Sequence, residues 1–144
     1  AVISAAGDGA VSWVTNLSGD YNMNELSYLE TPCFDFTDST TDPTISFLQY
    51  LHTEACCDHI WLEATTDGGV SWARVTADST SSNWFTNTVR QWWSGDSSGW
   101  WTASSRLVGM AGQGNVRFRF VFESDDINAA EGVGLDHVEV FHSE

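Results

Sequence analysis

Oxygen-bearing side chains are concentrated in the segment that follows residue 124. They are Asp125, Asp126, Asn128, Glu131 and Asp136. Ca²⁺ takes about six to eight oxygen ligands from carboxylates, amides and carbonyls, so this composition is typical of a calcium-binding loop. The spacing is not that of an EF-hand, because counting from Asp126 puts Ala130 at the fifth position and His137 at the twelfth.

A serine motif lies between two tryptophan pairs. Residues 95–99 read GDSSG, which fits the Gly-x-Ser-x-Gly spacing of a nucleophile elbow around Ser97. An elbow needs a buried strand before the serine and a helix after it, and neither is expected here. No histidine motif pairs with Ser97, and nothing selects a glycosidase carboxylate pair among the twenty acids. The sequence therefore predicts a protein that is not an enzyme.

Five tryptophans lie between residues 84 and 101. They are Trp84, Trp92, Trp93, Trp100 and Trp101. Indoles exposed on one face stack on sugar rings or capture peptide side chains, and on this interpretation Trp92, Trp93, Trp100 and Trp101 bind the ligand. The alternative is that they cover one end of the fold and fix a long loop, because Trp is usually mostly buried.

The three cysteines are Cys33, Cys56 and Cys57, too few for a disulfide framework. One bridge from Cys33 to Cys56 or Cys57 is expected if the chain is exported. Asp58 and His59 follow the cysteine pair, but no second CxxC or HxxxH pair completes a zinc site.

The charge of the chain limits its partners. The 144 residues carry a formal net charge of −15, with five basic residues, all of them Arg. We therefore expect no binding to nucleic acid or anionic membranes, whereas metal cations, neutral sugars and peptides fit this charge. No segment has the pattern of a membrane span or a signal peptide, so we expect a mature form or a module of a longer protein.

Period-two hydrophobic patterns predict an all-β chain. In residues 116–123, Val116, Phe118, Phe120 and Phe122 share one face. Further strands are expected at residues 11–17, 33–36, 44–52, 105–110 and 138–141. Loop composition is found at residues 18–27 and 84–101. About eight to ten strands without helical periodicity predict a single domain, residues 1–144, folded as a two-sheet antiparallel sandwich.

Residues 60–75 predict a β-hairpin. Apolar residues enter and leave a turn formed by Asp67, Gly68 and Gly69. Thr65, Asp67, Gly69 and Trp72 fit the spacing of an Asp-box, in which the carboxylate caps backbone N–H groups and the indole folds over the turn.

The order of these segments resembles a group of bacterial extracellular jelly-roll modules. The resemblance is carried by SWVTNL, PCFDF, ISFLQYLHTE, DHIWLEATTDGGVSW, GWW, LVGMAGQGNVRFRFVFESD and EGVGLDHVEV, within residues 10–142. Similar modules are the MAM-like domain of immune inhibitor A metalloproteases and the Asp-box-bearing subrepeats of reelin. The resemblance implies a non-catalytic antiparallel jelly roll that often holds a structural calcium ion.

In such jelly rolls the metal tends to connect an N-terminal loop with the last strand. The resemblance therefore implies Asp20, Asn24 and Asp136 as calcium ligands, with Asp125 in reserve. The alternative is a set of solvated acidic loops that hold no ion.

Two functions are consistent with these features. The first is a binding module of a secreted or cell-surface protein, with a structural calcium ion and a glycan or peptide ligand. The second is a structural or assembly domain, a spacer or filament subunit that contacts other protein subunits. Both imply an extracellular or cell-surface location.

Overall fold

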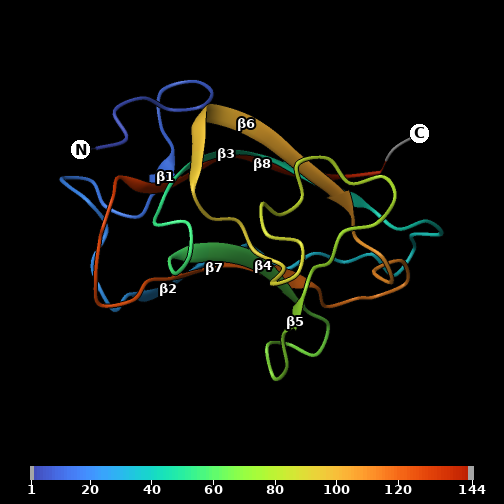
Figure 1. Ribbon diagram of the computed structural model, residues 1–144. Helices are drawn as coiled ribbons and strands as arrows, with labels where there is room; N and C mark the ends of the chain where they lie inside the picture. The colour runs from blue at the N-terminus through green and yellow to red at the C-terminus, as the bar shows by residue number, and fades with distance from the viewer. Residues whose placement is uncertain (1, 143–144) are drawn as a thin grey trace.

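The computed structural model describes residues 2–142 as a sandwich of two antiparallel β-sheets (Figure 1). Eight strands and no helix occur in this range, which confirms the expected all-β, two-sheet architecture. None of the described residues, in consequence, belongs to a helix that could cross a membrane. Residues 1, 143 and 144 of the expected domain lie outside the described part of the chain.

Each sheet has four strands. The first sheet has the order β1-β8-β3-β6, formed by β1 (Trp13–Val14), β8 (Gly132–Phe141), β3 (Thr44–His52) and β6 (Asp96–Arg106). The second sheet has the order β2-β7-β4-β5, formed by β2 (Leu26–Glu30), β7 (Arg117–Glu123), β4 (His59–Thr65) and β5 (Ala73–Arg74). In Figure 1 the first sheet lies above the second.

Alternate residues of the long strands fill the space between the sheets. Ile45 and Phe47 of β3 are buried, and Phe118, Phe120 and Phe122 of β7 are buried opposite them. Phe47 and Phe120 meet edge to face across the sheets, with ring centroids 4.9 Å apart. Burying each large apolar side chain stabilises the fold by about 1.5–3 kcal/mol. The buried face predicted for residues 116–123 is therefore confirmed.

Residues 66–72 form the turn that joins β4 to β5, and the turn contains the Asp-Gly-Gly sequence, as predicted. The Asp67 carboxylate accepts the Ser71 N–H at 2.9 Å, and Gly68 and Gly69 have φ angles of 77° and 89°. Hydrogen bonds from the Ser71 hydroxyl and N–H lower the pKa of Asp67 to about 2. A Cβ on Gly69 would lie 3.7 Å from the Trp72 indole, which shows that this ring folds back over the turn.

Several strand boundaries differ from the sequence prediction. The loop predicted over residues 84–101 is wrong for residues 96–101, which form the first part of β6. Their Ser and Gly residues carry no alternation, and pairing with β3 makes them a strand, with Tyr50 opposite Trp100. Of the strand predicted at residues 11–17 only β1 pairs, and of residues 33–36 only Phe34 forms a bridge, to Val116. Residue pairing, which depends on distant segments, decides these boundaries.

Candidate functional site

Two cavities lie along the side of the sandwich where β1 and β2 are the edge strands. Their volumes are about 230 and 160 Å³. We call them together the open-side groove. Trp13, Leu29 and Phe120 line both cavities, Ile60 and Leu135 line the first, and Phe34, Val138 and Val140 line the second.

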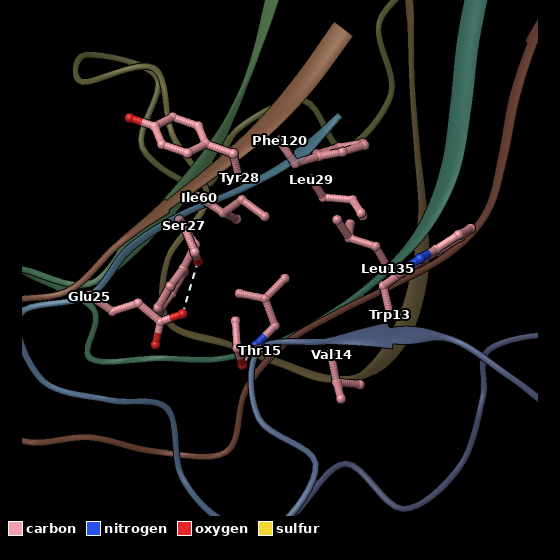
Figure 2. A pocket seen from close by; sticks show the side chains of 12 residues that line it. Trp13, Val14, Thr15, Glu25, Ser27, Tyr28, Leu29, Ile60, Phe120 and Leu135 are labelled. Carbon is pink, nitrogen blue, oxygen red and sulfur yellow. Dashed lines mark hydrogen bonds between the residues drawn. The ribbon is translucent and has the colours of Figure 1, made fainter. Parts of the chain in front are cut away.

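The first cavity is mainly apolar and has an indole at its rim. Leu29, Ile60, Phe120 and Leu135 project into it from both sheets, as Figure 2 shows. Trp13 belongs to a strand of two residues, and 55% of its surface is exposed. A half-exposed indole beside an apolar cavity is typical of a ligand-binding surface.

Negative charge lies at the edge of the groove. Glu25 lines the first cavity and Glu30 lines the second, and no described residue that lines either cavity carries a positive charge. Glu25 accepts a hydrogen bond from the Ser27 hydroxyl at 2.9 Å (Figure 2), and Glu30 lies 3.5 Å from Arg117. The groove therefore combines an apolar floor with carboxylates at its edge.

The groove lies next to a strand edge that lacks a neighbour. β3 pairs with β8 from Gly132 to Phe141, whereas β1 pairs only with Gly134 and Leu135. Within residues 2–142 no further strand pairs with β8. Val138 of β8 lies beyond the part covered by β1 and lines the second cavity. The unpaired edge of β8 therefore runs alongside the groove.

A third cavity, of about 280 Å³, lies between β5 and residues 107–110. Its lining includes the polar side chains of Thr66, Ser71, Arg74 and Thr76. The adjoining edge strand, β5, has only two residues. Apolar side chains, among them Val75, Leu107 and Met110, also line this cavity. It differs from the open-side groove in having a basic side chain, Arg74, in its lining.

Three carboxylates meet where the turn after β3 approaches the loop after β7. Oxygens of Glu54, Asp58 and Asp125 lie within 4.8 Å of one another, and we call these residues the acidic cluster. Asp58 is fully buried, and its Oδ1 accepts the Asp125 N–H at 2.8 Å. Its Oδ2 accepts the hydroxyl of Tyr21. None of the ion pairs formed between described residues involves the acidic cluster.

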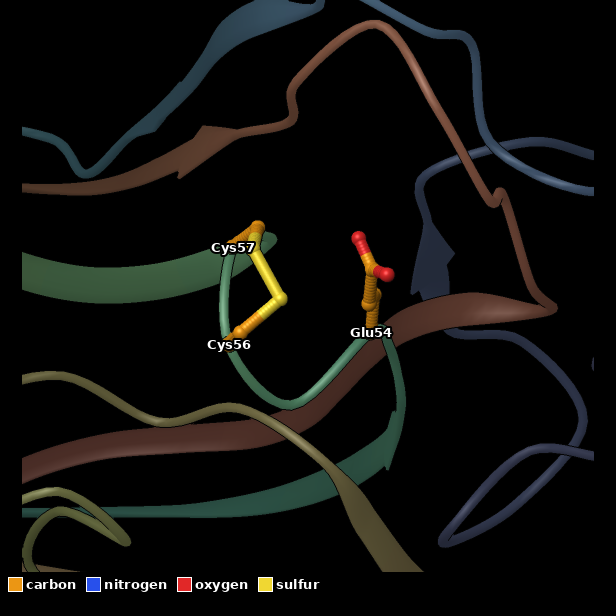
Figure 3. A group of neighbouring side chains, drawn as sticks. All are labelled: Glu54, Cys56 and Cys57. Atoms are coloured by element: carbon orange, nitrogen blue, oxygen red, sulfur yellow. A yellow bond between two sulfur atoms is a disulfide. The ribbon is translucent and has the colours of Figure 1, made fainter.

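Glu54 has a buried carboxylate oxygen that is available to coordinate a cation. Its Oε1 accepts a hydrogen bond from Asn128 Nδ2 at 2.8 Å, whereas its Oε2 is buried and has no partner among the described residues. Leaving a buried anionic oxygen without a donor costs free energy, and a hard cation would supply the missing contact. The Glu54 carboxylate also lies beside the sulfurs of Cys56 and Cys57 (Figure 3).

The structure brings one of the four predicted calcium ligands, Asp125, into the acidic cluster. Asn24 lies next to it, because its N–H donates to the Asp125 carbonyl at 2.6 Å. Asp136 lies elsewhere, on the first sheet, where its carboxylate accepts the N–H groups of Asp8 and His137 at 2.8 and 2.7 Å. Two of the four are therefore adjacent and the third has separate partners.

The fourth predicted ligand, Asp20, is exposed and directly precedes Tyr21, which contacts the cluster. The sequence reasoning did not select Glu54 or Asp58 as ligands. One feature of the sequence could have indicated them: they lie on either side of the cysteine pair, shortly before a buried strand.

The four tryptophans predicted to bind a ligand do not share a face. Trp93 is completely buried and packs on Phe47 with ring centroids 5.7 Å apart, so its assignment as a ligand-binding residue is wrong. Trp101 is directed towards the interior, where its Nε1 donates to Gln49 Oε1 at 3.2 Å. Trp100, the preceding residue of β6, points to the other face of the sheet.

Trp92 belongs to a stack of rings on the second sheet. Its ring centroid lies 3.7 Å from that of His59, which lies 5.3 Å from Trp61, and the Arg74 guanidinium lies 4.4 Å above Trp61. Burial lowers the pKa of His59, so the imidazole is neutral at pH 7. The rings cover one another, which agrees with the alternative that these indoles fix a loop.

The disulfide differs from the prediction. Cys56 and Cys57 are bonded to each other, and Cys33 is a free, exposed thiol. Cys33 lies at the end of β7 near Val116, whereas the cysteine pair lies at the opposite end, near Glu123. A strand of this length separates the two places by roughly 20 Å, while a disulfide requires Cα atoms within about 7 Å. The predicted bridge to Cys33 is therefore wrong.

Ser97 lies inside β6. Its hydroxyl accepts the Leu51 N–H at 2.9 Å and donates to the Gly99 carbonyl at 2.5 Å. The Leu51 contact lies at the register shift between β3 and β6, where it connects the two strands.

No protein-family model matches the chain, and no curated protein matches it either.

Proposed function

We propose that this chain is a non-catalytic binding module that takes an extended peptide in the open-side groove. The observation that carries the proposal is the groove itself, two adjoining apolar cavities with the half-exposed Trp13 at their rim. Each apolar side chain that a ligand buries there would contribute about 1.5–3 kcal/mol before the cost of ordering the ligand.

A peptide fits this surface better than a glycan. Glycans need several hydrogen-bonding side chains around an aromatic face, whereas this groove offers mainly carbon atoms of Leu29, Phe120 and Val138. The neighbouring edge of β8 offers backbone groups that a peptide can pair with.

Charge favours a basic ligand over another copy of the chain. Glu25 and Glu30 border the groove, and the chain has a formal net charge of −15. Lys or Arg beside the apolar residues of a peptide would be attracted to this edge. A second copy would be repelled, which argues against the alternative of a self-assembling subunit.

The proposal includes a structural calcium ion held by Glu54, Asp58 and Asp125. The ion would neutralise three adjacent carboxylates and join the turn after β3 to the loop after β7. Support comes from the buried Glu54 Oε2, which lacks a partner, and from the all-oxygen donor set, which suits Ca²⁺ better than Zn²⁺.

An extracellular or cell-surface location is part of the proposal. The disulfide between Cys56 and Cys57 supports it, because disulfides persist mainly in oxidising compartments. The strand order of the two sheets supports the jelly-roll topology expected of such modules.

Arrays of short peptides and of glycans, probed with the full chain in the presence of calcium, test the ligand class. We expect basic, apolar-containing peptides to bind and Trp13→Ala to weaken their binding about tenfold or more. Val89→Ala, at a residue 90% exposed and outside the groove, is the matched control and should leave binding unchanged. Binding of glycans alone, or of peptides regardless of Trp13, would contradict the proposal.

Thermal melting with calcium or with a chelator tests the ion. A ligand at about 100 times its Kd stabilises the native state by about 2.7 kcal/mol, so calcium should raise the melting temperature. Glu54→Gln should remove the response, and Asp126→Asn, which removes a charge next to Asp125, should keep it. An unchanged melting temperature in the unsubstituted chain would rule out a tightly held structural calcium ion.

A further inference from the structure

We infer that the peptide enters the groove as an added β-strand, antiparallel to β8 and hydrogen-bonded to its unpaired edge. This inference rests on the proposed function, since it concerns the ligand of the same groove. In strand addition the backbone supplies affinity, and pockets for alternate side chains supply specificity.

β1 shows how a strand is seated at this edge. Trp13 lies opposite Leu135 and Val14 opposite Gly134, both antiparallel, and Trp13 faces the groove together with Leu135. The register of β8 shifts between Asp136 and Glu139, where His137 has a φ of 48°, so the added strand would lie beyond this bulge, beside residues 138–141. Every second side chain would then lie on the groove side, next to Val138 and Val140. β1 therefore already pairs with this edge of β8, over two residues, in the antiparallel geometry that an added strand would use.

The chain's own N-terminal segment does not occupy the edge. The Asp8 N–H donates to the Asp136 carboxylate, and Asp8 Oδ2 lies 2.8 Å from His137 Nδ1. A Cβ on Gly7 would lie 2.7 Å from the Trp100 ring, so this segment crosses the face of the first sheet. These contacts leave the edge of β8 beyond Leu135 without a strand among the described residues.

The chemistry of the two sides of the edge defines the occupant. On the groove side, Val138 and Val140 adjoin a cavity of about 160 Å³, which suits Val, Leu or Ile side chains. On the other side of β8, Glu139 is exposed and lies 2.9 Å from His137 Nε2, and Glu30 lies at the rim of the same cavity. The net charge of −15 leaves this surface negative overall. The occupant is therefore an extended segment of another protein in which branched apolar residues alternate with Lys or Arg.

The probe is a synthetic peptide of about eight residues in which Val or Leu alternates with Arg or Thr, bound to the full chain. Two matched controls have the same length, one with Glu in place of Arg and one with the same residues in scrambled order. A set of peptides with one N-methylated amide each removes single hydrogen-bond donors. These changes are made in the peptide, so the fold of the protein is not disturbed.

N-methylation should weaken binding with a period of two. Methylation of amides that face β8 should reduce affinity about tenfold or more, and methylation of the alternate amides should change it less than about twofold. On the protein, hydrogen exchange should slow at those amides of residues 138–141 that face away from β3. The Glu peptide and the scrambled peptide should bind at least about tenfold more weakly.

The outcomes distinguish strand addition from the proposed function. Binding that depends on Trp13 but shows no period of two, or that protects amides of β2 instead of β8, overturns strand addition and leaves the proposed function standing. No binding by any peptide removes both claims. Equal binding of the Arg and Glu peptides overturns the basic occupant.

Discussion

The hydroxyl of Tyr21 donates a hydrogen bond to the buried carboxylate of Asp58, which joins the N-terminal loop to the turn that precedes β4. The same phenol oxygen accepts the Glu54 N–H at 3.2 Å. Asp58 receives a second donor from the Asp125 N–H. The Tyr21 hydroxyl thus contacts the carboxylate of one cluster residue, Asp58, and the backbone of another, Glu54.

Tyr21→Phe should destabilise the fold. It removes one of the two hydrogen-bond donors to the fully buried Asp58 carboxylate. Leaving a buried polar group unsatisfied lowers the free energy of unfolding by about 1–3 kcal/mol, and by more when the group is charged. Urea denaturation gives the change in the free energy of unfolding. Tyr28→Phe, at a tyrosine 50% exposed, is the control and should change little. Equal stability of the two variants would show that the Tyr21 hydroxyl contributes nothing.

The free energy of unfolding should fall at alkaline pH because two tyrosines have raised pKa values in the folded protein. Burial and the hydrogen bond to Asp58 raise the pKa of Tyr21, and the hydrogen bond to Glu131 raises the pKa of Tyr50 to about 12. Unfolded tyrosine loses its proton near pH 10, so the unfolded state binds fewer protons above that pH. The contribution is therefore complete below about pH 10 and is lost as the pH rises towards the folded pKa.

Denaturation series between about pH 8 and pH 12 measure this loss. Tyr50→Phe should make the decline shallower, because phenylalanine has no proton to lose. Tyr28→Phe is again the matched control. An identical decline in the Tyr50→Phe variant would show that Tyr50 ionises normally in the fold.

Gly134→Ala should destabilise the first sheet. A Cβ at this position would lie 2.6 Å from the far edge of the Trp100 indole, which crosses β8 here. Overpacking of this kind costs about 1–3 kcal/mol. Trp100→Phe shortens the ring and should reduce the penalty in the double variant, as a double-mutant cycle of unfolding free energies would measure. Additive effects would mean that Trp100 can move aside.

Thiol titration tests the corrected disulfide. The folded chain should react with one equivalent of thiol reagent, at the exposed Cys33, and with three equivalents after reduction. Cys33→Ser should remove the reaction before reduction. If Cys33 were bridged to Cys56 or Cys57, the unsubstituted chain would also react with one equivalent, but the Cys33→Ser variant would react with two before reduction. Two reactive thiols in that variant, assigned to Cys56 and Cys57 by peptide mass mapping, would contradict the disulfide described here.

Strand prediction was reliable where the residues themselves carry the alternation. Phe118, Phe120 and Phe122 recur at every second position, so one face is apolar whatever the rest of the chain does. It was unreliable for β6, where residues 96–99 are Asp, Ser and Gly and take their extended form from pairing with β3. Local pattern cannot report a pairing between segments about fifty residues apart.

The candidate sites were less predictable than the strands. Trp93 and Trp92 are neighbours in the sequence, yet one is in the core and the other stacks on His59. The acidic cluster takes Glu54 and Asp58 from one turn and Asp125 from another, so counting acids within a single loop finds only part of it. The open-side groove exists because β1 ends after two residues, and the residues around β1 contain no pattern that predicts this early end.

The sequence by itself determined that this protein is an acidic two-sheet β-sandwich with an Asp-Gly-Gly hairpin, because alternation and turn chemistry act between residues close along the chain. The tertiary structure alone decided which acids meet, which indoles remain exposed and which strand edge stays open. Those outcomes depend on packing and backbone pairing between residues distant in sequence, which a linear pattern does not encode.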